Sequence, residues 1–337
     1  MPRTNTRVVL PGPYQAVLEE TPLPALAPDQ ALVKNSYTLI SPGTELAMFT
    51  QSHVAFGDPR VPWARYPYSP GYAAVGHVEA VGTAVAGLAV GDTLVYLGAH
   101  QAYGILNQAD LWVRVPGGMP LEWATFAPLA QIANTAGWVS QAQPGDTVAV
   151  VGLGLVGNLA AQLFGVFGAS VVGLDLVPFR RDLAGRVGIS RVLDPGADLA
   201  ESIRAATDGR GADTVVEATG EPTLIGPALQ AVRPRGEVIL LGSPRGPATL
   251  DVYYDIHRTG AVLKGAHVGL LPRRAADGGL DRQTVMGQML ELIQARRLVV
   301  EPLISEVISL RQIEAGYRAV LEEKGRVLTF LIEWPDR

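Results

Sequence analysis

Three glycines followed by an acidic residue form the pattern with the most specific chemistry in this chain. Gly152, Gly154 and Gly157 have G-x-G-x-x-G spacing in "VAVVGLGLVGNLAAQ", and Asp175 comes 18 residues after Gly157. An apolar strand precedes the glycines and a helix follows them, which is the context of the dinucleotide-binding fingerprint. The glycines allow a tight turn, close approach of a pyrophosphate and close packing of the helix on the strand. The pattern predicts a dinucleotide site; the alternative is a turn that merely needs glycines.

The residues around the glycines indicate which dinucleotide would bind. Backbone amides near Leu155 and Val156 would point at the phosphates from the positive end of the helix dipole. Asp175 would accept hydrogen bonds from ribose hydroxyls and repel a 2′-phosphate, so NAD(H) is preferred. Arg180 follows five residues later. It could still receive that phosphate, which keeps NADP(H) open, or it could be a solvated residue on a helix surface.

Two further strand ends carry small residues. "EATG" includes Thr219 and Gly220, and "LGSP" includes Gly242. The carboxyl ends of parallel strands share one edge of the sheet, where ligands bind. We therefore expect these backbones to line the nicotinamide half of the site.

Within the stretch "TLISPGTELAMF", the segment "SPGTE" places two hydroxyls and a carboxylate at the start of an apolar run. Pro-Gly with flanking Ser and Thr is ordinary turn chemistry. In that interpretation Thr44 caps a helix and Glu45 is a first-turn carboxylate. The other interpretation makes the stretch the edge of an active site.

The elements that must position these residues change character along the chain. Residues up to about 120 predict short strands between Pro and Gly turns, which indicates antiparallel β structure. A single helix is expected in "LEWATFAPLAQIANTAGWVSQAQ". From Asp146 onward, apolar strands alternate with helices, which is typical of a parallel sheet covered on both faces. We expect one domain from residues 1–125 and 300–337, and a second from residues 126–299.

Composition excludes several classes of protein and of site. The chain has 337 residues, a net charge of −5 and no cysteine. The acidic balance argues against nucleic-acid binding. No apolar run reaches the ~18 residues of a membrane span, and "MPRTNTRVVLPGP" lacks the hydrophobic region of a signal peptide, so we expect a cytoplasmic protein without membrane contact. Zero cysteines exclude disulfides, iron–sulfur clusters, thiolate nucleophiles and cysteine-based zinc sites.

The order of these motifs resembles the medium-chain dehydrogenase/reductase superfamily, and the zinc-type alcohol dehydrogenases in particular. The resemblance covers nearly the whole chain and rests on "ISPGTEL", "PGYAAVGHVEAVG", "VGDTLV", the glycine fingerprint with Asp175, and "KGRVLTFL". It implies an α/β fold, with a GroES-like β-rich catalytic domain and a Rossmann domain built on a doubly wound parallel sheet. "GTE" and "PGYAAVG" are most similar to a cysteine-poor branch that includes the bacteriochlorophyllide hydroxyethyl dehydrogenases.

The zinc ligands of the family are missing at the matching positions. The first ligand cysteine falls on Pro42, the "G-H-E" motif on Gly71–Ala73, and the third ligand near Ala127 or Pro128. A catalytic zinc ion needs three protein ligands of suitable type. We therefore expect no zinc and no other metal site.

Without a metal, hydrogen-bond donors must stabilise the oxygen of the substrate. Thr44 keeps the position of the proton relay in the family, and Tyr72 replaces the ligand histidine. Glu45 takes the place of an acid that supports the metal, and His53 could relay protons. Each of these residues could instead have a purely structural role. Tyr72 could be a packing residue, Thr44 a helix cap, Glu45 a first-turn carboxylate and His53 a structural residue.

The resemblance implies an NAD(P)-dependent enzyme that transfers hydride. We expect interconversion of a secondary alcohol and a ketone on a bulky organic substrate, since aromatic residues fill "SHVAFGDPRVPWARYPYSP". One alternative is an enone or quinone reductase, and another is a nucleotide-binding redox sensor without turnover. In relatives the position of His267 approaches both the nicotinamide and a second subunit. A homodimer is expected from the resemblance alone.

Overall fold

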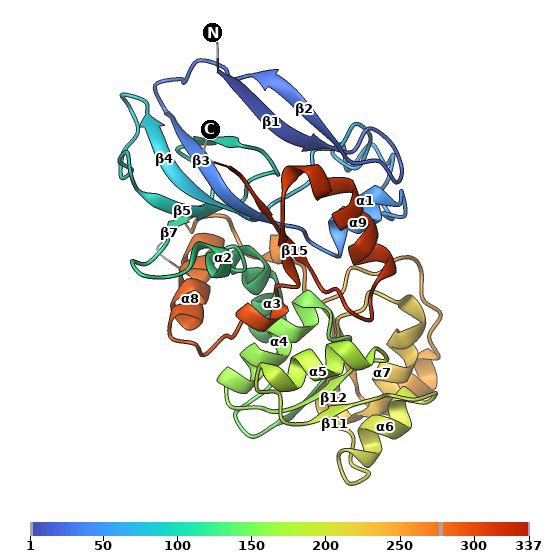
Figure 1. Ribbon diagram of the computed structural model, residues 1–337. Coiled ribbons are helices and arrows are strands. Elements are labelled where there is room, and N and C mark those ends of the chain that lie inside the picture. The colour runs from blue at the N-terminus through green and yellow to red at the C-terminus, as the bar shows by residue number, and fades with distance from the viewer. Residues whose placement is uncertain (1–2, 276–278, 336–337) are drawn as a thin grey trace. The chain divides into compact units, whose positions relative to one another are not determined.

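The computed structural model describes residues 3–275 and 279–335, and their contacts divide the chain into two compact units. Unit 1 comprises residues 1–128, 272–295 and 304–337, and unit 2 comprises residues 129–271 and 296–303. The blue and red ends of the chain in Figure 1 belong to unit 1, and most of the green and yellow segments belong to unit 2. Among the described helices, none combines the length and the apolarity that crossing a membrane requires.

Unit 2 is built on a six-stranded parallel sheet. Its strands are β8 (Thr147–Val151), β9 (Ser170–Leu174), β10 (Val192–Leu193), β11 (Ala212–Glu217), β12 (Val232–Leu240) and β13 (Val262–Gly265). They lie in the order β10-β9-β8-β11-β12-β13, and every neighbouring pair is parallel. Counted from β8, this is the Rossmann order 3-2-1-4-5-6, whose switch point lies between β8 and β11. The predicted parallel sheet is confirmed.

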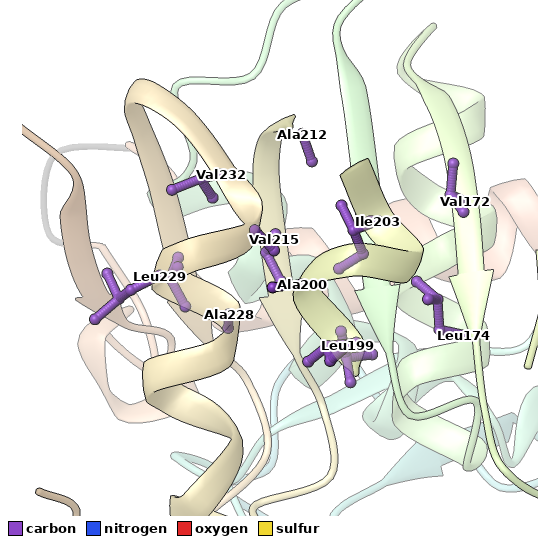
Figure 2. Close-up of a cluster of buried hydrophobic side chains, with 14 of the residues drawn as sticks. Val172, Leu174, Leu199, Ala200, Ile203, Ala212, Val215, Ala228, Leu229 and Val232 are labelled. Atoms are coloured by element: carbon purple, nitrogen blue, oxygen red, sulfur yellow. The ribbon is translucent and has the colours of Figure 1, made fainter. Parts of the chain in front are cut away.

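Helices follow the strands of this sheet. They are α4 (Leu155–Val166), α5 (Pro178–Arg186), α6 (Leu199–Ala205) and α7 (Ile225–Ala231), with shorter turns η1 (Pro222–Leu224), η2 (Val252–His257), η3 (Val268–Leu270) and η4 (Glu301–Leu303). Figure 2 shows side chains of α6 and α7, such as Ile203 and Leu229, gathered against Val172 and Val215 of the sheet. Every residue of β11 is buried, so both faces of the sheet are covered. Full burial of each such aliphatic side chain contributes about 1.5–3 kcal/mol.

Unit 1 contains a seven-stranded sheet and a separate hairpin. The sheet has the order β14-β15-β3-β4-β5-β7, with β6 also paired to β3. Its strands are β3 (Gln30–Leu39), β4 (Ala74–Val81), β5 (Thr93–Tyr96), β6 (Tyr103–Asn107), β7 (Trp112–Arg114), β14 (Glu306–Ile308) and β15 (Phe330–Glu333), and the hairpin pairs β1 (Thr4–Val9) with β2 (Val17–Pro22). All pairs are antiparallel except β14 with β15. The predicted antiparallel β region is confirmed.

A hydrophobic cluster in unit 1 joins the start of the chain to its end. Helix α1 (Thr44–Phe49) contributes Met48 and Phe49, and helix α9 (Ile313–Glu322), which follows turn η5 (Leu310–Gln312), contributes Tyr317. The rings of Phe49 and Tyr317 stack with their centroids 5.3 Å apart. This packing places the phenol of Tyr317 beside the helix that begins in the Pro-Gly stretch.

The structure differs from expectation after residue 120. Two helices, α2 (Leu121–Ala124) and α3 (Ala127–Val139), replace the single expected helix. Pro128 explains the break, because proline fits the first turn of a helix but not its interior. Residues 272–295, which we expected in the nucleotide domain, cluster with unit 1, where α8 (Arg282–Gln294) packs on β7 and α2.

Candidate active site

The glycine loop after β8 is shaped by two close contacts and one open space. A Cβ atom on Gly157 would lie 1.9 Å from the carbonyl oxygen of Gly152, and one on Gly152 would lie 2.6 Å from Cγ2 of Thr219. Gly152 also has a positive φ of 91°. A Cβ atom on Gly154 would meet no atom within 4 Å. The packing therefore requires glycine at two positions, and the third leaves room for a pyrophosphate above the start of α4, so the loop fits a dinucleotide.

The carboxylate of Asp175 is fixed beside this loop. Its Oδ2 accepts the N–H of Leu153 at 2.8 Å, and its Oδ1 accepts the N–H of Val177 at 2.8 Å. Arg180 Nη1 lies 3.6 Å from Oδ2, and the buried Nε of Arg180 has no hydrogen-bond partner in the described chain. Arg181 instead donates to the carbonyl oxygen of Asp175. The acid and Arg180 thus stand together at the end of β9.

A buried carboxylate that the sequence did not single out organises the ends of β11 and β12. Glu217 accepts the N–H groups of Thr219 at 2.7 Å and Gly220 at 3.1 Å. Burial raises the pKa of Glu217. The N–H of Gly242 donates to the carbonyl oxygen of Glu217 at 2.8 Å, and a Cβ atom on Gly242 would lie 2.3 Å from the nitrogen of Gly220.

The expected cofactor residues therefore share one edge of the sheet. Gly152, Gly154, Leu155, Val156 and Gly157 follow β8, Asp175 follows β9, Thr219 and Gly220 follow β11, and Gly242 follows β12. The loop after β8 is bonded to Asp175 through the N–H of Leu153, and Gly152 lies close to Thr219. His267 follows β13 and is exposed; its Nδ1 accepts the N–H of Gly269 at 3.1 Å.

In unit 1 the structure pairs two hydroxyls. Tyr72 hydrogen bonds through its hydroxyl to Oγ of Ser41, which is buried. Burial raises the pKa of the Tyr72 phenol to about 12; the bond to Ser41 opposes the rise, and the charge of Glu45 adds to it. Thr44 also hydrogen bonds to this phenol. Thr44 is the first residue of α1, whose N-cap is Gly43 without a side-chain bond, so the helix-cap interpretation of Thr44 is wrong.

Glu45 is completely buried and accepts three hydrogen bonds. Its Oε1 accepts the N–H of Ser41 at 2.9 Å; its Oε2 is 2.9 Å from Nε2 of His100 and accepts the hydroxyl of Tyr317 at 2.5 Å. His100 and Tyr317 are completely buried as well. Burial and the Glu45 carboxylate hold the pKa of Tyr317 well above its ordinary value. Glu45 is thus a buried acid and not an ordinary solvated carboxylate at a helix start.

His53 lies in an aromatic loop after α1. Its Nδ1 accepts the N–H of Ala55 at 3.2 Å, and its ring meets Trp63 edge-on with centroids 5.0 Å apart. The Trp63 and Tyr68 rings are 6.2 Å apart, and 49% of Trp63 is exposed. The loop therefore presents aromatic surface on unit 1.

Solved structures share this architecture over the whole chain. An Escherichia coli oxidoreductase/dehydrogenase of unknown specificity superposes with a TM-score of 0.85 at 19% identity, covering 99% of this chain and 100% of that one. The 2R,3R-butanediol dehydrogenase of Bacillus subtilis superposes with a TM-score of 0.81 at 21% identity, covering 98% and 100%. At these identities the likeness establishes the fold.

Sequence comparison establishes the family. The zinc-binding dehydrogenase family matches residues 156–282. The L-threonine 3-dehydrogenase of Pyrococcus horikoshii is 30% identical over 282 residues, which are 72% of this chain and 76% of that protein. The chain belongs to the zinc-type alcohol dehydrogenase-like members of the medium-chain dehydrogenase/reductase superfamily. The predictions of that family, of its α/β fold and of an NAD(P)-dependent oxidoreductase are confirmed.

The side chains present do not fit the zinc ion that gives this family its name. Pro42 has no ligating side chain, and the Tyr72 hydroxyl is hydrogen bonded to Ser41. Glu45 and His100 are of ligating type, but they bond to each other, and together they are fewer than the three ligands that zinc needs. Within residues 3–275 and 279–335, no three His, Asp or Glu side chains gather as a metal site would require.

Three residues of the polar cluster around Glu45 and Tyr72 were not proposed from the sequence as catalytic, namely Ser41, His100 and Tyr317. Ser41 lies within the Pro-Gly stretch, but its bond to Tyr72 spans 31 positions. His100 is 55 residues from Glu45, and Tyr317 is 272 residues from it. No local pattern signals such pairings, because they depend on how distant strands and helices pack.

Proposed function

We propose that this enzyme is a zinc-independent, NAD(H)-preferring oxidoreductase that interconverts a secondary alcohol and a ketone. The observation behind this proposal is the hydroxyl pair of Ser41 and Tyr72 beside the buried Glu45. Tyr72 stands where zinc-type relatives hold a ligand histidine, and Ser41 directly precedes Pro42, where they hold the first ligand cysteine. When bound, the nicotinamide supplies or accepts the hydride. The residues of the chain then have to stabilise an oxygen and move a proton.

Tyr72 is the proposed proton donor in the direction of ketone reduction. Its raised pKa keeps the phenol protonated at neutral pH, so a proton is available for the alkoxide that forms. Ser41 and Thr44 both hydrogen bond to this phenol and would stabilise the phenolate after transfer. His53 is proposed to relay protons between this group and solvent.

The preference for NAD(H) rests on Asp175. The carboxylate is held by two backbone N–H groups beside the glycine loop, which leaves a fixed negative charge where ribose hydroxyls bind. Arg180 lies 3.6 Å from it and offsets part of that charge. We therefore propose that NADP(H) is bound as well, but more weakly.

The aromatic loop supports a bulky substrate. Trp63 and Tyr68 place two rings within 6.2 Å of each other, and aromatic walls suit large apolar molecules. We also propose a homodimer, since unit 2 exposes three large side chains of η2, namely Val252, Tyr253 and Tyr254. Light scattering after size exclusion tests the dimer: a monomeric mass at all concentrations contradicts it.

Steady-state assays with NADH test the function. The purified enzyme is given matched panels of bulky ketones, enones and quinones, and NADH consumption is followed at 340 nm. Turnover of ketones above the other panels supports the proposal. Turnover of enones or quinones alone contradicts the proposal and indicates an enone or quinone reductase. NADH binding without turnover on any panel indicates a nucleotide-binding redox sensor. Elemental analysis is the companion measurement: one tightly held zinc per chain overturns the metal-free reaction.

A further inference from the structure

The three bonds to Glu45 determine the protonation of its neighbours. An ionised carboxylate only accepts hydrogen bonds, so Ser41 N–H, Tyr317 O–H and His100 Nε2–H all donate to it. The proton of a neutral His100 ring is therefore on Nε2. Three donors compensate for the cost of burying the charge, which is large for an unpaired carboxylate.

The imidazole of His100 is held by its surroundings and aimed at Glu45. Its backbone N–H donates to the carbonyl of Pro70 at 2.9 Å, and its carbonyl accepts the N–H of Val8 at 2.8 Å. A Cβ atom on Gly71, whose φ is 100°, would lie 2.5 Å from the His100 nitrogen, so only glycine allows this approach. The buried Nδ1 has no hydrogen-bond partner in the described chain. The ring thus directs its one side-chain hydrogen bond to Glu45.

Glu45 in turn holds the backbone that carries the hydroxyl pair. The N–H group that Oε1 accepts is that of Ser41, and the side chain of the same residue bonds to the Tyr72 phenol. A shift of the carboxylate would therefore move Ser41. We propose that His100 is a positioning residue of the reaction: acting through Glu45, it holds the Ser41–Tyr72 hydroxyl pair in place.

A purely stabilising role explains this arrangement less well. Replacing a buried ionic group by well-packed apolar residues is often neutral or favourable for stability, so such a group is weak evidence for a stability function. The network also connects directly to the phenol that the proposed function uses. This inference rests on that function for its kinetic consequences, but its geometric content is independent of it.

The experiment compares two histidine variants and a matched pair of tyrosine variants. His100→Leu removes the donor to Glu45, whereas His100→Gln keeps an amide N–H at a similar distance along the side chain. Tyr317→Phe removes a buried hydroxyl bonded to Glu45, and its control Tyr96→Phe removes a buried hydroxyl bonded at 2.8 Å to Asn35 in the same unit. For each variant, kcat and KM are measured with the best ketone and NADH, and thermal stability is recorded.

We expect His100→Leu to lower kcat by about 10–100-fold, the loss that a small misplacement of reacting groups causes. KM should change by less than about twofold, since the pair acts in the transition state. His100→Gln should recover most of kcat. Both tyrosine variants should lose similar thermal stability, and only Tyr317→Phe should lose kcat. If His100→Leu does not fold, the comparison of kcat between Tyr317→Phe and Tyr96→Phe tests the positioning role.

A crystal structure of His100→Leu tests the positioning role independently of the proposed function. If His100→Leu does not fold, the structure of Tyr317→Phe is used instead. Separation of Ser41 Oγ from the Tyr72 hydroxyl supports the positioning role, even if the wild-type enzyme reduces no ketone. An unchanged Ser41–Tyr72 bond overturns it, even if ketone reduction is established. Wild-type kcat in His100→Leu or in Tyr317→Phe overturns it as well.

Discussion

The N–H of Leu153 donates to the carboxylate of Asp175 across 2.8 Å, and this bond joins the glycine loop after β8 to the end of β9. The acid is therefore part of the loop's own structure in addition to its expected contact with ribose. A substitution at Asp175 has to preserve the first role if it is to test the second.

Asp175→Asn should change cofactor choice while keeping the bond to the glycine loop. The amide oxygen can still accept the Leu153 N–H, but the amide NH2 group cannot accept the Val177 N–H, so that bond is lost. The negative charge is lost too, so repulsion of a 2′-phosphate disappears. We expect the ratio of kcat/KM for NADH over NADPH to fall by about tenfold or more, which corresponds to ~1.4 kcal/mol. Asp194→Asn is the matched control, because that half-exposed acid pairs with Arg181. An unchanged ratio in Asp175→Asn would remove the residue from cofactor selection.

Two alanine substitutions in the glycine loop should have opposite effects. The Cβ atom of Gly154→Ala enters open space, so we expect wild-type thermal stability and at least about tenfold weaker NADH binding. The Cβ atom of Gly157→Ala would lie 1.9 Å from a carbonyl oxygen, so this variant should be destabilised by several degrees or fail to fold. Fluorescence titration with NADH and thermal melting measure both. Equal affinity for NADH in wild type and Gly154→Ala contradicts a pyrophosphate in that space.

Tyr72→Phe should lower kcat while leaving cofactor binding intact. The variant keeps the ring but removes the proposed proton donor, and loss of one such group typically costs ~10²–10³ in rate. Steady-state kinetics and NADH titration check the prediction. Tyr96→Phe is the control, since it removes a buried hydroxyl that bonds to Asn35. Full turnover by Tyr72→Phe would leave the phenol with a packing role only.

Two partly buried tyrosines should make the folded chain lose stability in alkali. Burial raises the pKa of Tyr37 and of Tyr72 to about 12, whereas an unfolded tyrosine titrates near 10. From about pH 10 to about pH 12 the unfolded chain releases protons that the folded chain keeps, so the free energy of unfolding falls as pH rises. The expected fall is up to ~1.4 kcal/mol per pH unit for Tyr72, and it is smaller for Tyr37, which solvent screens more strongly.

Urea denaturation in steps from about pH 8 to about pH 11 measures this slope. The double variant Tyr37→Phe/Tyr72→Phe should reduce the slope above about pH 10, because two of the groups that titrate differently in the two states are removed. Burial also raises the pKa values of Tyr66, Tyr68, Tyr96 and Tyr317, so these four tyrosines keep the rest of the slope. An identical slope in wild type and double variant would contradict the assignment.

The sequence was most informative where function depends on local backbone geometry. The spacing of Gly152, Gly154 and Gly157 and the distance to Asp175 encode a strand–turn–helix unit, which forms from neighbouring residues alone. Strand β2 has no clear signal in the sequence, because it is largely exposed and lacks apolar alternation. Likewise, nothing near residue 282 indicates that α8 packs with unit 1.

The cluster around Glu45 could be predicted from the sequence only in part. Motif matching drew attention to Glu45 and Tyr72, but it could not supply His100 or Tyr317, whose contacts cross 55 and 272 positions. Ser41 belongs to the Pro-Gly stretch, but only the packing of the folded chain brings its hydroxyl to that of Tyr72. Burial and partner identity are properties of the assembled sheet.

The sequence distance between Glu45 in α1 and Tyr317 in α9 also has a consequence for biosynthesis. Glu45 leaves the ribosome well before its third donor, Tyr317, which follows 272 residues later. Most of unit 2 is one continuous segment, residues 129–271, which can complete its sheet while the ribosome is still translating the rest. Most of unit 2 is thus able to fold before the buried acid of unit 1 has acquired all its hydrogen-bond partners.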